Sequence, residues 1–288
     1  MKKKFIAITG PTSGIGRETA MSLGNQGNHL LLFSRNEAKL KDLSKELKAQ
    51  GVKDVDYFNC DLASIHSIRR ASNEFYSKFD TIDVLINNAG GIIPEKRFSA
   101  EDYEYTFAMN HLGHFYLTNL LKPALAKSEA PRVISVSSVA HQMGNLNFKD
   151  LARRNKGYSG FKVYADAKLC NIYFSKELAR RWSDINVQAH CLHPGVVKTG
   201  FASEYKGLMG LLVKLGAAFM ISAEKGADTS IFLASTDKLD QYENGSYFIK
   251  RKVKSPTKLA QSKAKASQLW EYSLELLHKV GVQVNEFS

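Results

Sequence analysis

Short apolar runs alternate along the chain with longer amphipathic segments. The apolar runs predict strands at 4–9, 29–34, 55–60, 83–87, 132–137, 186–192 and 245–250. Apolar positions at helical spacing predict helices at about 15–26, 36–49, 64–79, 101–125 and 162–182. Short apolar strands separated by helices are typical of a parallel sheet that is covered on both faces. We therefore predict an α/β fold, a doubly wound parallel sheet of about seven strands (a Rossmann fold), in one domain over residues 1–288.

The composition is that of an ordinary globular protein, with 288 residues, 44% hydrophobic and 24% charged. The three cysteines, Cys60, Cys170 and Cys191, are far apart and have no metal-ligand spacing. They argue against a disulfide framework and against a metal site, and they predict a reduced, cytoplasmic setting. The apolar run in MKKKFIAITG is too short for a signal peptide, and no run approaches the ~18 apolar residues of a transmembrane helix.

The net charge of +12 is concentrated in a few segments, above all KRKVKSPTKLAQSKAK at 250–265. Such a charge favours nucleic acid or an anionic membrane as a partner, or else forms a solvated basic surface. Because no nucleic-acid-binding motif accompanies the charge, we expect no nucleic-acid partner. We expect a basic C-terminal extension at about 251–288 and leave peripheral membrane contact open.

A glycine-rich stretch, ITGPTSGIG, follows the first predicted strand and opens the first helix. Gly10, Gly14 and Gly16 permit a tight turn and a close approach of the backbone to a phosphate, and the helix N-terminus supplies free N–H groups. The stretch predicts a nucleotide-binding loop that includes Ser13 and Ile15. A glycine-rich turn without a ligand is the alternative.

The end of the second strand, LLFSRN, bears on the identity of the nucleotide. An acidic residue there binds a ribose 2′-hydroxyl, whereas an arginine suits a 2′-phosphate. Ser34 occupies the acidic position, Arg35 follows it, and Arg17 lies just beyond the last glycine. Two cations and no carboxylate favour NADP(H) over NAD(H). Surface arginines without a role are the alternative.

Two further polar segments end predicted strands. Asp61 and Leu62 follow the third strand, and the NNAG segment, with Asn88, Ala89 and Gly90, ends the fourth. Ligands of open α/β sheets bind at the carboxyl ends of the strands, so both segments are candidate cofactor contacts. Capping of a local turn by the Asp and Asn side chains is the alternative.

The chain contains, in this order, T-G-x3-G-x-G, D-L, N-N-A-G, a mid-helix asparagine, S-S, Y-x3-K and P-G-x-V-x-T. This ordered set resembles the classical short-chain dehydrogenase/reductase superfamily over about residues 4–250. Within the superfamily, the chain is most similar to the branch of retinol dehydrogenases and the WW-domain oxidoreductase. The similarity lies in the segments SSVAHQMGNLNFKDL, KVYADAKLCNIYFSKEL and HPGVVKTG. In that branch the serine and tyrosine of the site are far apart, and here 25 residues separate Ser138 from Tyr164.

The resemblance implies roles for four residues. Tyr164 would be the general acid/base and Lys168 its partner, which also holds the nicotinamide ribose. Ser138 would bind the substrate oxygen, with Ser137 as the alternative, and Asn110 would order a water or else be structural. Lowering a tyrosine pKa from ~10 by ~3 units requires the phenolate to be stabilised relative to the neutral hydroxyl by ~4 kcal/mol. An ammonium ~5 Å from the phenolate contributes roughly 3 kcal/mol of this stabilisation at an effective dielectric constant of ~20.

The resemblance also implies a nicotinamide-amide loop at Pro194, Gly195, Val197 and Thr199, preceded by His193, which we expect to be a loop residue and not a catalyst. The next segment, 200–222, is rich in apolar residues and predicts a substrate lid, with a plain core helix as the alternative. In the family the helices that carry Asn110 and Tyr164 form dimer interfaces, which implies a homodimer.

These observations predict an NADP(H)-dependent oxidoreductase that interconverts an alcohol with an aldehyde or ketone, and an apolar lid favours a small lipophilic substrate. A non-catalytic NADP-sensing regulatory protein is one alternative. A sugar-nucleotide epimerase is another, although that branch prefers a G-x2-G-x2-G loop and a larger C-terminal domain than this chain has after residue 250.

Overall fold

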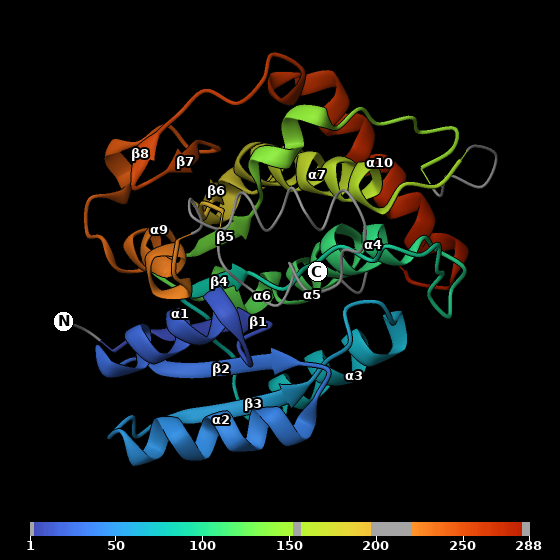
Figure 1. Ribbon diagram of the computed structural model, residues 1–288. Helices are drawn as coiled ribbons and strands as arrows, with labels where there is room; N and C mark the ends of the chain where they lie inside the picture. Colours follow the sequence, from blue (N-terminus) through green and yellow to red (C-terminus); the bar gives the residue numbers. More distant parts are fainter. Residues whose placement is uncertain (1–2, 152–156, 197–220, 284–288) are drawn as a thin grey trace.

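The computed structural model describes residues 3–151, 157–196 and 221–283 (Figure 1). Its sheet has the order β3-β2-β1-β4-β5-β6-β7-β8. Pairing is parallel throughout except between β7 and β8, which are antiparallel. The predicted fold is therefore confirmed, with one short strand added. The strands are β1 (Phe5–Thr9), β2 (His29–Ser34), β3 (Val55–Asn59), β4 (Val84–Asn87), β5 (Arg132–Val136), β6 (Gln188–His193), β7 (Tyr247–Ile249) and β8 (Lys252–Val253).

The order of the strands reverses beside β1, which pairs with β2 on one side and with β4 on the other. In sheets of this kind the crevice at such a reversal, outside the carboxyl ends of the strands, is the usual place for a nucleotide. The three central residues of β1, Ile6, Ala7 and Ile8, have no exposed surface. Burial on both faces explains why the strand reads as a continuous apolar run.

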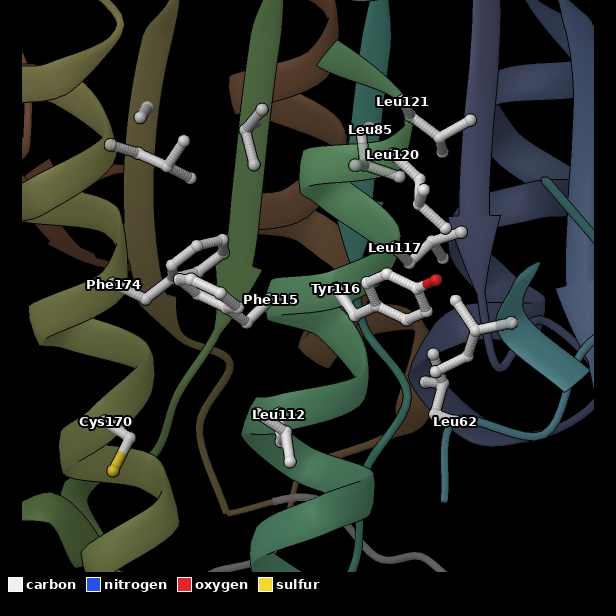
Figure 2. Close-up of a cluster of buried hydrophobic side chains, with 14 of the residues drawn as sticks. Leu62, Leu85, Leu112, Phe115, Tyr116, Leu117, Leu120, Leu121, Cys170 and Phe174 are labelled. Atoms are coloured by element: carbon white, nitrogen blue, oxygen red, sulfur yellow. The ribbon is translucent and has the colours of Figure 1, made fainter. Parts of the chain in front are cut away.

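Helices cover both faces of the sheet. The apolar cluster on one face includes residues of α1 (Gly14–Asn25), α2 (Glu37–Ala49) and α9 (Ala223–Ser235). The cluster on the other face includes residues of α3 (Ile65–Tyr76), α5 (Gly113–Leu120) and α7 (Gly160–Arg181). Figure 2 shows part of this second core, where Phe115 of α5 faces Phe174 of α7 with ring centroids 5.7 Å apart.

Side chains cap the N-terminal ends of three helices, and the helix predicted from about residue 162 begins earlier, at Gly160. Asn36 accepts a hydrogen bond from Lys39 N at the start of α2, and Ser64 accepts one from Ser67 N at the start of α3. Ser159 does the same at the start of α7, where its hydroxyl accepts from Lys162 N. Such caps satisfy backbone N–H groups that have no partner inside the helix.

The continuous helix predicted at 101–125 is wrong. The segment comprises α4 (Tyr105–Phe107), a π-helical turn η1 (Ala108–Leu112), α5 and α6 (Lys122–Ala126). Residues 101–104 are not helical because Asp102 has a φ of 62° and the Glu104 carboxylate caps the helix, accepting from Phe107 N at 2.6 Å. The π turn holds Asn110 at its centre, and π turns inside α-helices are frequent at functional sites.

The described residues after β8 pack on the rest of the domain through helix α10 (Lys263–Lys279). This helix lies along α7 (Figure 1). The Trp270 ring of α10 is 4.8 Å from the ring of Phe115 and 6.0 Å from that of Phe174, centroid to centroid. Ser273 Oγ is 2.9 Å from His111 Nε2 in the π turn. Most of the basic segment at 250–265 remains exposed.

The predicted lid at 200–222 lies almost entirely outside the described residues, which resume at Ile221. Ile221 N donates to Val196 O at 2.8 Å, and Ser222 caps α9 by accepting from Lys225 N. Within the described residues there are also the 3-10 turns η2 (Val139–Met143), η3 (Ser183–Ile185), η6 (Leu239–Gln241) and η7 (Leu259–Gln261).

Candidate active site

The glycine-rich turn after β1 has the geometry of an anion site. Gly10 has a φ of 63°, and a Cβ there would lie 2.9 Å from Ala89, so only glycine fits. A Cβ at Gly16 would lie 2.2 Å from the Gly10 carbonyl oxygen. Helix α1 begins at Gly14, its cap residue Ser13 makes no capping hydrogen bond, and its first turn has no acidic side chain. Its N–H groups are thus available to a phosphate.

The end of β4 is tied to this turn. Asn88 Nδ2 donates to Thr9 O at 2.9 Å and to Gly10 O at 3.1 Å. The backbone N–H groups of Asn88 and Ala89 both donate to Thr9 Oγ1 at 3.0 Å. Two predicted cofactor-contact segments therefore form one rigid unit at the carboxyl edge.

Asp61 and Leu62 lie at the same edge, after β3. Asp61 Oδ1 accepts from Ala63 N at 3.0 Å, which is the local turn that the sequence left as the alternative. This bond uses one carboxylate oxygen only. Leu62 is buried, and its carbonyl oxygen would lie 2.0 Å from a Cβ at Gly113, so α5 packs closely on this loop.

The two arginines predicted to select the cofactor differ in their partners. Arg17 forms ion pairs with Glu18, at 3.1 Å, and with Glu46 of α2. Arg35 is exposed, and its Nη1 donates to the hydroxyl of Tyr105 at 3.0 Å. The guanidinium of Arg97 lies 4.4 Å from the centre of the same Tyr105 ring.

Arg97 was missed by the sequence reasoning because it lies in a loop far from Arg35 along the chain. Its position close to Tyr105 adds a second cation beside the end of β2.

Tyr164 and Lys168 are one turn apart on α7, with Lys168 Nζ 5.4 Å from the centre of the Tyr164 ring. Tyr164 is half-buried, whereas Lys168 is 3% exposed, and its Nζ donates to Val136 O at 3.0 Å. Burial lowers the pKa of Lys168 to about 8. The ammonium thus remains mostly protonated at neutral pH and can stabilise a negative charge on the tyrosine oxygen.

The two serines that end β5 have different environments. Ser137 is buried, and its hydroxyl donates to Lys168 O at 2.7 Å. Ser138 is half-buried and caps η2, where its Oγ accepts from Ala140 N at 3.2 Å. The Ser137 proton is therefore committed to the protein, while the bond at Ser138 leaves its proton available to a substrate oxygen.

Two buried histidines hold the backbone around Ser138. His141 Nδ1 donates to Ser138 O at 2.7 Å, and His193 Nδ1 accepts from Val139 N at 3.3 Å. Burial lowers the pKa of both imidazoles, that of His193 to about 4. His193 is the last residue of β6 and not a loop residue, and both rings have structural partners.

Asn110 lies fully buried in the π turn. Its Nδ2 donates to Gly91 O at 2.9 Å and to Thr106 O at 2.8 Å, and its Oδ1 accepts from Gly91 N at 3.2 Å. A Cβ at Gly90 would lie 2.4 Å from Asn110 Oδ1 and 3.0 Å from Lys168 Nζ. The asparagine and the lysine therefore meet at Gly90. Asn110 can order a water only through one Oδ1 lone pair or its backbone carbonyl.

The predicted amide-binding loop is described in part. Pro194 and Gly195 follow β6. Gly195 has a φ of 100°, and a Cβ added there would lie 2.5 Å from Ile221 Cδ1. Val197 and Thr199 lie outside the described residues.

Comparison with known proteins decides the family. Residues 4–150 match the short chain dehydrogenase family. Human retinol dehydrogenase 13 is 34% identical over 291 residues, covering 98% of this chain and 87% of the relative. Mouse retinol dehydrogenase 12 is 35% identical over 275 residues, covering 95% and 86%. The chain belongs to the short chain dehydrogenase family. It is thus an oxidoreductase related to the retinol dehydrogenases, with a site for a nicotinamide cofactor.

Solved structures share the fold. An uncharacterized protein from Mycobacterium paratuberculosis is 29% identical, with a TM-score of 0.78 over 96% of this chain and 93% of that chain. The L-sorbose reductase of Gluconobacter frateurii, solved with NADPH and L-sorbose, is 22% identical with a TM-score of 0.68 over 86% and 95%.

In the described part of this family member, no helix combines the length and the apolar character needed to cross a membrane. Within the same residues, no group of three or more His, Cys, Asp or Glu side chains could hold a metal ion.

Proposed function

We propose that the protein is an NADP(H)-dependent oxidoreductase that interconverts a lipophilic alcohol with its aldehyde or ketone. The observation that carries the proposal is the placement of Lys168 Nζ, buried and 5.4 Å from the Tyr164 ring, on the helix that packs against the end of β5 with Ser138. Such an arrangement supplies a proton donor, a charge to support it and a hydrogen-bond donor for a substrate oxygen.

When bound, the nicotinamide supplies or accepts the hydride at its C4 atom. In the reducing direction the Tyr164 hydroxyl gives its proton to the substrate oxygen, and in the oxidising direction the phenolate takes it back. The Lys168 ammonium stabilises that phenolate by roughly 3 kcal/mol at a separation of ~5 Å and an effective dielectric constant of ~20. The Ser138 hydroxyl donates to the substrate oxygen and stabilises the charge that develops there.

The NADP(H) preference rests on charge at the end of β2. Arg35 is exposed, Ser34 stands where a carboxylate would select NAD(H), and Arg97 lies close by. Arg17 is the weaker candidate for the 2′-phosphate because Glu46 and Glu18 already hold its guanidinium. NAD(H) use at lower affinity is compatible with this arrangement.

A lipophilic substrate is supported by the side chains around Ser138. Val139 and Met143, both in the turn that Ser138 caps, are 38% and 64% exposed and present apolar surface beside the site. The relatives named retinol dehydrogenases point the same way. The complete set of Ser138, Tyr164 and Lys168 disfavours a sensor without turnover. The glycine-rich turn has the spacing G-x3-G-x-G and not the G-x2-G-x2-G that the epimerase branch prefers.

The homodimer that the family resemblance implies would form through the helices that carry Asn110 and Tyr164. Helix α10 covers the face of α5 and α7 through Trp270 and the Ser273–His111 contact. A homodimer through these helices would need α10 displaced, so we propose that any self-association uses another surface. We also propose a cytoplasmic location, with a peripheral membrane contact through the exposed basic residues at 250–265.

The direct test is the oxidation of NADPH by the purified protein with a panel of aldehydes, ketones and retinal. The Tyr164→Phe variant should lose nearly all turnover and keep NADPH binding, because only the hydroxyl is removed. Tyr173→Phe, on the same helix with its hydroxyl bonded to Leu259 O at 2.6 Å, is the matched control and should keep its turnover. Tyr164→Phe turnover above roughly a few per cent of wild type would show that another group donates the proton.

A further inference from the structure

A third buried histidine lies between the glycine-rich turn and Asn110. His114 belongs to α5, one turn after Asn110, and is 2% exposed. Its Nδ1 is 3.1 Å from the backbone carbonyl oxygen of Asn110, and its Nε2 is 2.9 Å from Thr9 Oγ1. A single imidazole thus joins the end of β1 to the π turn.

The hydrogen-bond partners determine which nitrogen carries the proton. The Thr9 hydroxyl accepts from Asn88 N and Ala89 N, both at 3.0 Å, so its two lone pairs are used and its proton remains to donate. His114 Nε2 at 2.9 Å is a better acceptor for that proton than Ile86 O at 3.4 Å. At the other side of the ring the Asn110 carbonyl can only accept, so Nδ1 carries the hydrogen.

The neutral state of the ring follows from its surroundings. Burial lowers the pKa of His114 to about 4, and the charge of Lys168 opposes its protonation as well. At physiological pH the ring therefore has one donor and one acceptor, which are the two roles that its neighbours require.

We propose that His114 is a positioning residue that, as the neutral Nδ1-protonated tautomer, links the dinucleotide turn at Thr9 to the backbone carbonyl of Asn110. The link sets the place of Asn110 relative to Gly90 and Lys168. This inference rests on the proposed function, since the role is exercised during turnover. A histidine buried only to fill the core would not need both contacts.

Two variants separate the two contacts. In His114→Asn the amide nitrogen takes the place of Nδ1 and keeps the bond to the Asn110 carbonyl. In His114→Gln the amide oxygen takes the place of Nε2 and keeps the bond from Thr9. We expect His114→Gln to lose kcat by about 10- to 100-fold with NADPH affinity retained, because small displacements at a reacting site have effects of this size. His114→Asn should keep most of kcat and bind NADPH roughly 3- to 10-fold more weakly.

His111→Gln is the matched control. His111 is buried in the same π turn, and the glutamine amide can keep its contact with Ser273 of α10, so the variant should change neither kcat nor NADPH affinity. Thermal unfolding of all the variants verifies that each is folded. Equal losses of kcat in His114→Asn and His114→Gln would overturn the proposal.

An independent measurement uses the wild-type protein alone. The ¹⁵N NMR signals of the His114 ring at neutral pH should show a protonated Nδ1 and an unprotonated Nε2, and the opposite tautomer would overturn the proposal even if neither variant folds. If the wild-type protein reduced no carbonyl compound, the proposed function would fail. The tautomer and the NADPH affinities would still decide whether the link exists.

Discussion

The buried ammonium of Lys168 should reduce the stability of the fold. Its side chain is 3% exposed, and burial lowers its pKa from 10.5 to about 8. The charged form is therefore less favourable in the folded state than in the unfolded chain. Replacement of Lys168 by methionine removes the charge and keeps an unbranched side chain of similar length, so the variant should be more stable than the wild type at neutral pH.

The expected size follows from the change in pKa. Because one pKa unit corresponds to about 1.4 kcal/mol, a pKa of about 8 in place of 10.5 means that charge burial costs about 3 kcal/mol at pH 7. The variant also loses the hydrogen bond from Lys168 Nζ to Val136 O, worth ~1 kcal/mol. Val136 O keeps its donor Asn171 Nδ2 at 3.1 Å. The net gain is about 2 kcal/mol, or roughly 4 °C in Tm for a chain of this size.

The sign of the pH dependence is also fixed. Between pH 8 and pH 10.5 the unfolded chain binds more protons at this site than the folded protein, so wild-type stability rises with pH across this window. The methionine variant lacks this rise. Its advantage should therefore be largest below about pH 8 and should disappear as the pH approaches 10.5.

Thermal unfolding without cofactor, followed by circular dichroism at about pH 7 and about pH 9.5, measures both effects. Lys162→Met is the matched control, since Lys162 is exposed on the same helix and should give little change at either pH. A Lys168→Met protein that is less stable than wild type at pH 7, with a gap that does not vary with pH, would refute the reasoning. Turnover should be almost absent in the same variant.

Three further predictions concern the site and its ligands. Both Ser138→Ala, which loses the cap of η2, and Ser137→Ala, which loses the bond to Lys168 O, should lower stability by ~1 kcal/mol. Only Ser138→Ala should lower kcat strongly, and equal losses of kcat in the two variants would contradict the assignment. Arg35→Asp should weaken NADPH binding ~10- to 100-fold more than NADH binding in a fluorescence titration, and equal losses would show that Arg35 does not bind the 2′-phosphate. The specificity constant kcat/KM for straight-chain aldehydes should rise from four to about ten carbons by up to ~0.8 kcal/mol per methylene, and a flat series would indicate a small polar substrate.

The parts of the fold that follow from local pattern were predictable. The apolar runs identified β1 to β7 because parallel strands buried on both faces are apolar throughout. Ser64 marked a helix start because a hydroxyl there satisfies a free backbone N–H. Ser159, which caps α7, lies before the start predicted at about residue 162. Gly10 and Gly16 were expected to form a tight turn because they follow the first strand, and neither position has room for a Cβ in the structure. That the turn binds a nucleotide stays a prediction.

The parts that depend on distant partners were not predictable. The π turn around Asn110 has the same apolar spacing as an α-helix, so the sequence could not separate them. The caps and contacts that shape the segment come from Glu104, from Ser273 of α10 and from Gly91, none of which is identifiable from local pattern. Arg17 was predicted to contact the cofactor, yet its partner Glu46 lies on α2 and becomes visible only in three dimensions.

The residues proposed to act on the substrate and the residues that hold them in place differ in how they can be identified. Tyr164, Lys168 and Ser138 could be proposed from the ordered set of motifs that resembles the short-chain dehydrogenase family, because the resemblance assigns a role to each of them. The residues that hold them are neutral imidazoles, His114, His141 and others, whose ring nitrogens contact backbone atoms. Histidine suits this task because a buried neutral ring offers one donor and one acceptor in a fixed plane. The three histidines at positions 114, 141 and 193 are therefore better evidence for a fixed backbone than for acid–base catalysis.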